Sequence, residues 1–253
     1  MTARLATGNP WQLGDWQLFR RLAVCATAIF LLSVPPLRVA VLVSGHGSNL
    51  QALLDAFREP SAPATIALVI SNKAGAGALD RARRASVPTA TIAEDGQDAA
   101  TLLALLARHG VGLVVLAGYL KKVPAEVVAA FRGRMLNVHP ALLPCFGGVG
   151  MYGRRVHEAV LASGARISGV TVHVVDEQYD HGRILAQWPV PVRPGDTAET
   201  LAARVLEAEH RLLPAVVGAF ARCGAEPVCS LAAEAFGPAP SLQPEFADAL
   251  TVA

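Results

Sequence analysis

Short, continuous runs of apolar residues alternate along the chain with longer stretches in which apolar residues recur every three or four positions. The short runs predict buried strands at 39–43, 65–70, 89–92, 113–116 and 135–138. The longer stretches predict helices at 50–57, 78–84, 99–108 and 125–131. Strand–helix alternation at this spacing is typical of right-handed βαβ units. We therefore predict an α/β fold with a Rossmann-like open, mostly parallel sheet that carries helices on both faces.

The pattern changes after residue 144. A glycine-rich loop at 146–153 precedes a predicted helix at 155–162, two strand-like runs at 169–175 and 184–190, and a long amphipathic helix at 198–220. At the other end, the apolar run 22–34 is shorter than the roughly 20 residues that cross a bilayer. We expect residues 1–36 to form an extension outside the fold, with an export signal as the open alternative. Residues 37–222 then form one domain, and 223–253 form a tail.

Composition narrows the class of protein. The chain of 253 residues is 53% hydrophobic and only 6% aromatic, so its core must rest mainly on Ala, Val and Leu. The apolar fraction excludes a disordered chain. A formal charge of +2 without a Lys/Arg run argues against a nucleic-acid binder, and no membrane association is expected. Four irregularly spaced cysteines suggest neither a disulfide framework nor a zinc knuckle, which favours a reducing, cytoplasmic location.

The first candidate for chemistry is the segment 44–49, Ser-Gly-His-Gly-Ser-Asn, between the first strand and the first helix. Glycines there allow close approach of a ligand to the backbone, and unpaired N–H groups at a helix start suit a phosphate. A dinucleotide motif would need glycine where Leu50 stands, and the second strand ends in Ser71-Asn72-Lys73 rather than an acidic residue. A tight turn with Asn49 as helix cap remains the alternative.

A second candidate lies at the end of the fifth predicted strand, where Asn137 and His139 follow apolar residues. In open α/β sheets, ligands bind at the carboxyl ends of strands. Two residues apart, these side chains share one face of the strand, and an amide beside an imidazole suits an oxyanion. The alternative is a histidine whose ring is satisfied by backbone carbonyls.

The carboxylate-rich segment 173–182 is the third candidate. A carboxylate from this loop is placed to orient His139 and favour its imidazolium form. By itself the segment also fits a solvated turn. Its histidines and aspartates lack a zinc-like spacing, so we expect no metal. Cys145, close to the same site, leaves a Cys–His nucleophilic pair open.

Taken together, four segments resemble the phosphoribosylglycinamide formyltransferase family of folate-dependent enzymes. They are SGHGSN at 44–49, AGYLKKVP at 117–124, NVHPALLP at 137–144 and DEQYDHG at 176–182, and the resemblance covers roughly residues 37–220. It implies the formyltransferase fold for the domain at 37–222 and an enzyme of purine biosynthesis. Other formyltransferases share the Asn-x-His and late Asp pattern, whereas the Gly47-Ser48-Asn49 loop favours glycinamide ribonucleotide as substrate.

The resemblance also implies roles for individual residues. Asn137, His139 and Asp180 would be catalytic. Gly47, Ser48, Asn49 and Glu209 would bind the ribonucleotide, the first three through its phosphate. The folate pocket would be lined by Leu120, Lys121, Lys122, Val123, Asn137, Asp176, Glu177, Gln178, Tyr179 and Asp180.

The implied reaction is direct formyl transfer. The glycinamide amine attacks the formyl carbon of the co-substrate 10-formyltetrahydrofolate, and Asn137 and protonated His139 stabilise the oxyanion. Asp180 would orient His139 and raise its basicity. The resemblance implies no metal, no nucleic-acid partner, and a monomer or homodimer.

Three other functions are alternatives to formyl transfer to glycinamide ribonucleotide. A formyltetrahydrofolate hydrolase normally carries a regulatory domain before the catalytic one, and 36 residues are too few for it. Methionyl-tRNA formyltransferase would need an RNA-binding domain after the last helix, where about thirty residues remain. A non-catalytic folate- or nucleotide-binding module would lack one of Asn137, His139 and Asp180.

Overall fold

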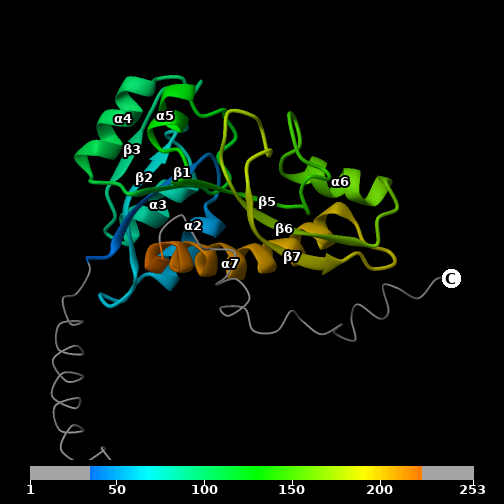
Figure 1. The fold of residues 1–253 in the computed structure, drawn as a ribbon. Helices are drawn as coiled ribbons and strands as arrows, with labels where there is room; N and C mark the ends of the chain where they lie inside the picture. Colours follow the sequence, from blue (N-terminus) through cyan, green and yellow to red (C-terminus); the bar gives the residue numbers. More distant parts are fainter. Residues whose placement is uncertain (1–34, 224–253) are drawn as a thin grey trace, which may run out of the picture. The chain divides into compact units, whose positions relative to one another are not determined.

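The computed structural model describes residues 35–223. In this part of the chain, seven strands form one sheet in the order β3-β2-β1-β4-β5-β6-β7 (Figure 1). The strands are β1 (Leu37–Val43), β2 (Ala64–Ser71), β3 (Thr89–Thr91), β4 (Leu113–Leu116), β5 (Met135–His139), β6 (Ile167–Val174) and β7 (Ile184–Pro191). The first five are parallel, while β6 and β7 run antiparallel to their neighbours. The predicted α/β, mostly parallel sheet is confirmed.

The helices follow the predicted pattern closely. They are α2 (Ser48–Ala56), α3 (Gly77–Arg84), α4 (Ala99–Arg108), α5 (Ala125–Ala130), α6 (Arg154–Ala162) and α7 (Ala198–Cys223). Only α7 departs noticeably, because it continues three residues past the predicted end at Phe220. The antiparallel pairing of β6 with β7 has a simple cause: the loop at 175–183 between these two strands is too short for the crossover that a parallel pair requires.

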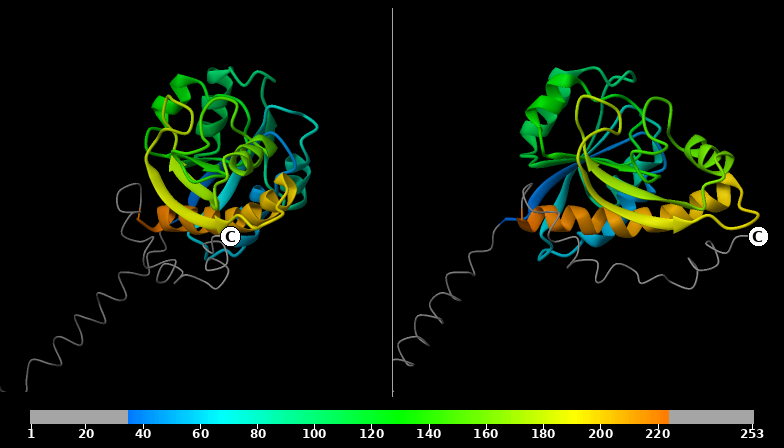
Figure 2. Two further views of the ribbon diagram at one scale, coloured as in Figure 1. Left: turned by 90° about the vertical axis from the view of Figure 1, so that its right-hand side faces the viewer. Right: turned by 45° about the vertical axis from the view of Figure 1, so that its right-hand side comes forward.

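Alternation along the strands divides the core between the two faces of the sheet. On β1, Val39, Val41 and Val43 pack into one cluster with residues of α2, α3 and α7. Ala40 and Leu42 point to the opposite face, where they pack with residues of α4 and α5. All five side chains are fully buried, and each Val or Leu contributes about 1.5–3 kcal/mol by leaving water. Figure 2 shows α7 lying along its face of the sheet.

The strand order creates the crevice that holds the site. The chain moves from β1 to β2 and β3 on one side, and then returns to place β4 and β5 on the other side of β1. The loops that follow β1 and β4 therefore leave the carboxyl edge in opposite directions, and such a switch point is where open α/β sheets bind ligands.

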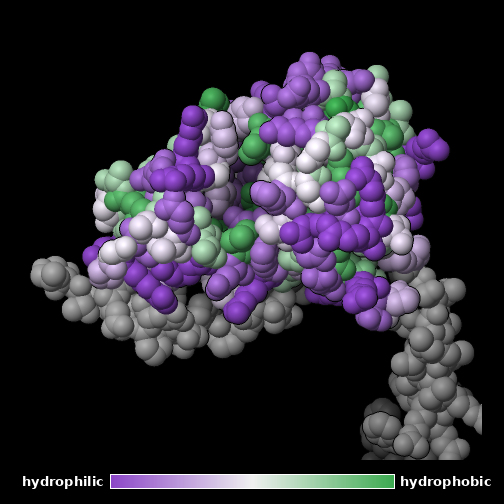
Figure 3. All heavy atoms as spheres, turned by 180° about the vertical axis from the view of Figure 1, so that it is seen from behind, coloured by the Kyte–Doolittle hydropathy of each residue, from purple (hydrophilic) through white to green (hydrophobic). Residues whose placement is uncertain are grey.

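The surface of the described residues is mixed in polarity. The face drawn in Figure 3 is mostly hydrophilic, with small separate hydrophobic patches. No helix within residues 35–223 combines the length and the apolar character that a membrane span needs. The predicted extension at 1–36, with its apolar run 22–34, and the predicted tail at 223–253 fall outside the described residues apart from their innermost positions, so both boundaries stay predictions.

Candidate active site

A cavity of about 750 Å³ opens at the carboxyl edge of the sheet, next to the ends of β4 and β5. It brings together side chains from segments far apart in the sequence. Its polar lining residues include Asn49, Lys121, Lys122, Asn137, His139, His157, His173, Asp176, Asp180 and Glu209. Apolar side chains such as Leu116, Val128 and Leu206 form much of the remaining wall. The predicted catalytic residues and the predicted ribonucleotide residues Asn49 and Glu209 thus share one cavity.

Asn137 and His139 end β5 on the same face of the strand, as predicted, and Asp180 reaches them from the loop after β6. Asp180 Oδ2 lies 3.5 Å from His139 Nδ1, and Asp180 Oδ1 accepts a hydrogen bond from Asn137 Nδ2 at 3.3 Å. The backbone of Asp180 has a φ of +54°, a region that non-glycine residues rarely adopt. The loop is therefore held in a strained turn that points the carboxylate back into the cavity.

The other nitrogen of the His139 imidazole also has a polar partner. His139 Nε2 lies 2.9 Å from the carbonyl oxygen of Phe146, so this nitrogen carries a proton and donates it. The alternative of a histidine satisfied by a backbone carbonyl is thus confirmed for one of the two nitrogens. Because its contacts are with Phe146 and Asp180, the ring is not oriented as the base of a Cys145 nucleophile, and Cys145 itself is exposed.

The expected effect of Asp180 on His139 is present but is outweighed. Burial lowers the pKa of His139, and this effect exceeds the increase caused by Asp180 and by the Phe146 carbonyl. His139 is only 3% exposed, which explains the size of the desolvation effect. The expectation that Asp180 raises the basicity of His139 is confirmed, but burial leaves the net pKa of the imidazole below its ordinary value.

Asp180 itself stays acidic. Burial raises the pKa of its carboxyl, but the hydrogen bonds that the carboxylate accepts, the N–H of Gly148 among them, and the nearby imidazole of His139 lower it by more, so that this pKa lies below the ordinary value. Gly148 donates its N–H to Asp180 Oδ2 at 2.9 Å. The glycine-rich loop at 146–153 thus contributes a backbone donor to the carboxylate and a backbone acceptor to His139.

Two histidines that the sequence analysis did not assign to the site line the same cavity. His173, on β6, pairs with Asn137 across the antiparallel β5–β6 ladder, and its Nε2 lies 3.0 Å from Asn137 Nδ2. His157, on α6, is 5% exposed, and its pKa is lowered by burial and by the nearby His139. The alternating pattern of β6 places His173 on one face of a strand, but only strand pairing shows which residue it meets.

At the other side of the cavity, Asn49 and Glu209 form a buried pair. Asn49 Nδ2 donates to Glu209 Oε2 at 2.5 Å, and the two residues are 9% and 7% exposed. Burial raises the pKa of Glu209 to about 7, while the Asn49 hydrogen bond offsets part of this increase. The alternative role of Asn49 as a helix cap is wrong, because α2 begins one residue earlier, at Ser48, and its cap is Gly47.

Gly47 occupies its position for two physical reasons. Its φ is +76°, which favours glycine, and a Cβ atom there would lie only 2.5 Å from the Cβ of Ala78 on α3. The glycine therefore lets the loop after β1 turn directly into α2 while packing against α3. Gly47 and Ser48 stand at the α2 N-terminus, next to the cavity-lining Asn49.

Nearly all residues of the two segments predicted to bind the folate line this cavity. Leu120, Lys121, Lys122 and Val123 line the cavity, as do Asp176, Gln178, Tyr179 and Asp180. Glu177 does not, and its carboxylate instead pairs with Arg132 at 2.6 Å on the surface. Within this turn its side chain is directed toward solvent, as in the solvated-turn alternative, and a folate contact of Glu177 stays a prediction.

A chain of buried hydrogen bonds fixes the first of these segments. The backbone N–H of Leu120 donates to Ser44 Oγ at 3.0 Å, and Ser44 Oγ donates to Asn72 Oδ1 at 2.7 Å. Asn72 Nδ2 in turn donates to the Glu94 carbonyl at 3.0 Å. The ends of β1 and β2 thereby hold the backbone of the segment after β4, which explains the polar residues at these strand ends.

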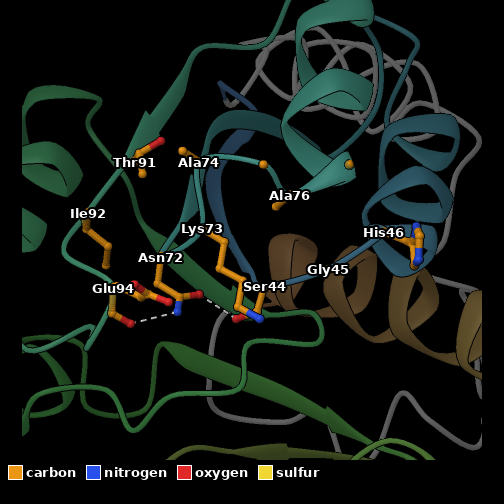
Figure 4. Close-up of a pocket in the computed structure, with 12 residues that line it drawn as sticks. Ser44, Gly45, His46, Asn72, Lys73, Ala74, Ala76, Thr91, Ile92 and Glu94 are labelled. Atoms are coloured by element: carbon orange, nitrogen blue, oxygen red, sulfur yellow. Dashed lines mark hydrogen bonds between the residues drawn. The ribbon is translucent and has the colours of Figure 1, made fainter.

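Ser44, Asn72 and Glu94 also border a second cavity of about 660 Å³ at the ends of β1, β2 and β3. Figure 4 shows Lys73 beside Ser44 in this cavity, with His46 lying apart from the hydrogen-bonded group. No group of three or more His, Cys, Asp or Glu side chains suited to a metal ion occurs within residues 35–223.

Comparisons with known proteins agree with this geometry. The formyl transferase family profile matches residues 37–217. A chloroplastic phosphoribosylglycinamide formyltransferase from Arabidopsis thaliana is 47% identical over 188 residues, which cover 72% of this chain and 64% of the relative. The human trifunctional purine biosynthetic protein adenosine-3 is 45% identical over 186 residues, which cover 71% of this chain and 18% of that protein.

Solved structures give the same result. A phosphoribosylglycinamide formyltransferase from Anaplasma phagocytophilum superposes with a TM-score of 0.70 at 39% identity, covering 74% of this chain and 87% of that one. The chain thus spans less than two thirds of the two curated relatives and most of the bacterial structure. The chain belongs to the formyl transferase family, and its relatives there include phosphoribosylglycinamide formyltransferases.

Proposed function

We propose that the protein transfers the formyl group of 10-formyltetrahydrofolate to the amine of glycinamide ribonucleotide, a step of purine biosynthesis. The observation that carries this proposal is the arrangement of one cavity. Asn137, His139 and Asp180 form a hydrogen-bonding cluster in it, and the buried Asn49–Glu209 pair lies in the same wall. A cavity of about 750 Å³ has room to bring the reacting parts of two substrates together.

The ribonucleotide binds beside α2 in this proposal. Its phosphate meets the backbone N–H groups at Gly47, Ser48 and Asn49, where the start of a helix provides unpaired donors and a positive dipole end. Glu209 then contacts the sugar-glycinamide part of the same molecule. The buried carboxylate provides acceptors that a hydroxyl or amine donor can use without competition from water.

The folate pterin occupies the apolar part of the cavity. Leu120 to Val123 and the Asp176–Asp180 loop border this part, with the exception of Glu177. A flat ring needs an apolar slot and a few hydrogen bonds at its edge. Backbone groups held by the Ser44–Leu120 hydrogen bond are suited to supply them.

The reaction proceeds by attack of the amine nitrogen on the formyl carbon. The carbonyl π electrons move to oxygen and form a tetrahedral oxyanion, which Asn137 Nδ2 stabilises by donating a hydrogen bond and protonated His139 stabilises by its positive charge. When the oxyanion collapses, the bond to the folate N10 breaks, and the proton lost by the amine moves to N10 through water. Asp180 keeps its charge next to His139 throughout, because its carboxyl pKa is low.

The low pKa of His139 shapes this mechanism. In the free enzyme, burial favours the neutral ring with its proton on Nε2. A developing oxyanion adds negative charge to the same buried site, and this charge favours the imidazolium. His139 thus gains charge by holding the proton that the attacking amine loses, before water carries that proton to N10, and this charge stabilises the transition state more than the bound substrate.

The remaining assignments complete the proposal. 10-Formyltetrahydrofolate is a co-substrate rather than a resident cofactor, and the reaction needs no metal. The protein acts in the cytoplasm as a monomer or homodimer without a nucleic-acid partner. These assignments rest on the sequence pattern described above.

A single assay separates this function from its alternatives. The full chain is mixed with 10-formyltetrahydrofolate, with and without glycinamide ribonucleotide, and formylated ribonucleotide and free formate are quantified by mass spectrometry. We expect formylated ribonucleotide only when both substrates are present, and loss of the product in the His139→Ala variant. Formate release without the ribonucleotide would instead identify a hydrolase. Binding without either product would identify a non-catalytic module.

A further inference from the structure

His173 stands out among the buried titratable groups because the formyl-transfer mechanism gives it no task. It is 2% exposed, lines the cavity, and has both ring nitrogens close to polar partners. Nδ1 lies 2.9 Å from the carbonyl oxygen of Val174, and Nε2 lies 3.0 Å from Asn137 Nδ2. These contacts determine which nitrogen carries the proton.

The orientation of the Asn137 carboxamide is fixed by Asp180. The end of the carboxamide that faces Asp180 Oδ1 lies 3.3 Å from it, and an ionised carboxylate can only accept hydrogen bonds. The amide NH₂ must therefore occupy this end, because the amide oxygen there would place two acceptors side by side. The other end, Oδ1, then faces away from the carboxylate.

The orientation of the amide in turn fixes the state of His173. The NH₂ group that faces Asp180 also lies 3.0 Å from His173 Nε2, so this nitrogen accepts a hydrogen bond and carries no proton. The single ring proton is on Nδ1, where the Val174 carbonyl accepts it. The contact between His173 Nε2 and Asp180 Oδ1, at 3.6 Å, is longer than a hydrogen bond.

We infer that His173 is a positioning residue for formyl transfer: as the neutral, Nδ1-protonated tautomer, it holds one N–H of Asn137 and thereby presents the other N–H to the formyl oxygen. In the free protein this second hydrogen is shared with Asp180 over the longer distance of 3.3 Å. The oxyanion takes it over as charge develops. The Val174 carbonyl excludes the opposite neutral tautomer, because that tautomer would place two acceptors 2.9 Å apart.

The inference rests on the proposed formyl transfer for its kinetic consequence but not for its structural one. Without the Nε2 acceptor, the carboxamide of Asn137 has Asp180 as its remaining fixed partner, and its N–H groups turn toward that carboxylate. An Asn137 N–H that is hydrogen-bonded to the Asp180 carboxylate must break this bond before it can donate to the oxyanion, so it stabilises the oxyanion less. Loss of one preorganised oxyanion donor lowers kcat by roughly 10²–10³, so misorientation of Asn137 should lower kcat at least about tenfold.

Two substitutions of similar size separate positioning from folding. His173→Gln places an amide oxygen near the position of Nε2 and so keeps the acceptor for Asn137. His173→Asn places an amide nitrogen near Nδ1, which keeps the donor to Val174 and removes the acceptor. We expect His173→Asn to lose kcat at least about tenfold with KM for both substrates changed less than about twofold, and His173→Gln to stay within about threefold of wild-type kcat. Equal losses in the two variants, or wild-type kcat in His173→Asn, would overturn the assignment.

A measurement on the unaltered protein needs no activity and no variant. ¹⁵N NMR of the histidine-labelled full chain, with the His173 resonance assigned, distinguishes the imidazolium from each neutral tautomer. We expect a protonated Nδ1 and an unprotonated Nε2. An Nε2-protonated ring or an imidazolium would refute the inference, whether or not the protein transfers formyl groups. Absence of formyl transfer by the wild type would refute the proposed function and leave the NMR result to decide the tautomer.

Discussion

Replacement of Glu209 by Gln should stabilise the protein at high pH. Glu209 is 7% exposed on α7, and burial raises its carboxyl pKa from the ordinary 4.5 to about 7. Between these pH values the folded protein keeps a proton that the unfolded chain releases. The folded state therefore loses stability as pH rises from about 4.5 to about 7, and the loss is complete above that range. A difference of this size in pKa corresponds to about 3 kcal/mol.

Glutamine removes this pH dependence without removing the contact. It is neutral at every pH, has nearly the same shape, and its Oε1 can accept the hydrogen bond that Asn49 Nδ2 now donates to Glu209. Urea unfolding at pH 5, 7 and 8.5 measures the effect. We expect Glu209→Gln to match the wild type within about 1 kcal/mol at pH 5 and to exceed it by up to about 3 kcal/mol at pH 8.5.

Glu207 provides the matched control, because it is an exposed glutamate on the same helix. Glu207→Gln should show no difference from the wild type that grows with pH. A constant difference between Glu209→Gln and the wild type at all three pH values would refute the reasoning. So would a loss of stability at pH 8.5, because it would mean that the ionised carboxylate has partners strong enough to overcome its burial.

The same variant should bind glycinamide ribonucleotide more weakly. Hydrogen bonds to a charged acceptor contribute about 1.5–3 kcal/mol, compared with about 1 kcal/mol for neutral pairs, so the affinity should fall by roughly tenfold. Calorimetric titration with each substrate checks this, and folate affinity should be unchanged. A variant that gains stability and keeps full ribonucleotide affinity would remove Glu209 from the binding site.

Three further predictions concern residues at the carboxyl edge of the sheet. Asp180→Asn should lower the pKa of His139 further, because Asp180 raises this pKa in the wild type. Formyl transfer should slow by roughly 10²–10⁴, and the loss should be larger at pH 9 than at pH 6. Transfer rates of the variant and the wild type, measured across this pH range, test both statements. Ser44→Ala should raise KM for the folate and leave KM for the ribonucleotide unchanged, because it removes the acceptor that holds the segment after β4. Gly47→Ala should cost at least about 1–2 kcal/mol in thermal unfolding, since φ is +76° and the added Cβ would lie 2.5 Å from a side chain of α3. Gly45→Ala is its control, because a Cβ there meets nothing within 4 Å.

Features that depend on local sequence could be predicted. Apolar runs of β-branched residues marked the parallel strands, and polar residues at a strand end marked Asn137 and His139. Both follow from physical rules that act over a few residues: side-chain alternation, and the placement of ligand-binding groups at the carboxyl edge. The same reasoning does not tell which side chains of the 176–180 loop face the cavity, because a turn has no fixed period; the side chain of Glu177, for example, pairs with Arg132 on the surface.

Features that depend on long-range pairing could not be predicted in the same way. Asn49 and Glu209 are 160 positions apart, and no periodicity in either segment indicates that they share a hydrogen bond. The link between His173 and Asn137 arises from the antiparallel register of β6 on β5, which the order of strands along the chain does not reveal. The upward effect of Asp180 on the pKa of His139 could be predicted, whereas the larger downward effect of burial could not, because a sequence does not show the depth of burial.

The two buried carboxylates of the cavity show how the surroundings of a side chain decide its role. Both are acids taken out of water, and burial alone raises the pKa of each. Asp180 accepts the N–H of Gly148 and lies beside the imidazole of His139, and its pKa falls below the ordinary value. Glu209 has only the Asn49 amide as a hydrogen-bonding partner, and its pKa rises to about 7. Groups whose pKa values are pushed apart serve different tasks.

Asp180 is a permanent charge beside His139, whereas Glu209 ionises close to neutral pH. A ligand that donates hydrogen bonds to Glu209 should therefore bind its charged form and release its proton into solution. Ribonucleotide binding should therefore release a proton near pH 6.5 but none near pH 9. Calorimetric titrations in buffers of different ionisation enthalpy measure the number of protons released per ribonucleotide bound. Equal proton release at both pH values would contradict the assignment of Glu209 to the ribonucleotide.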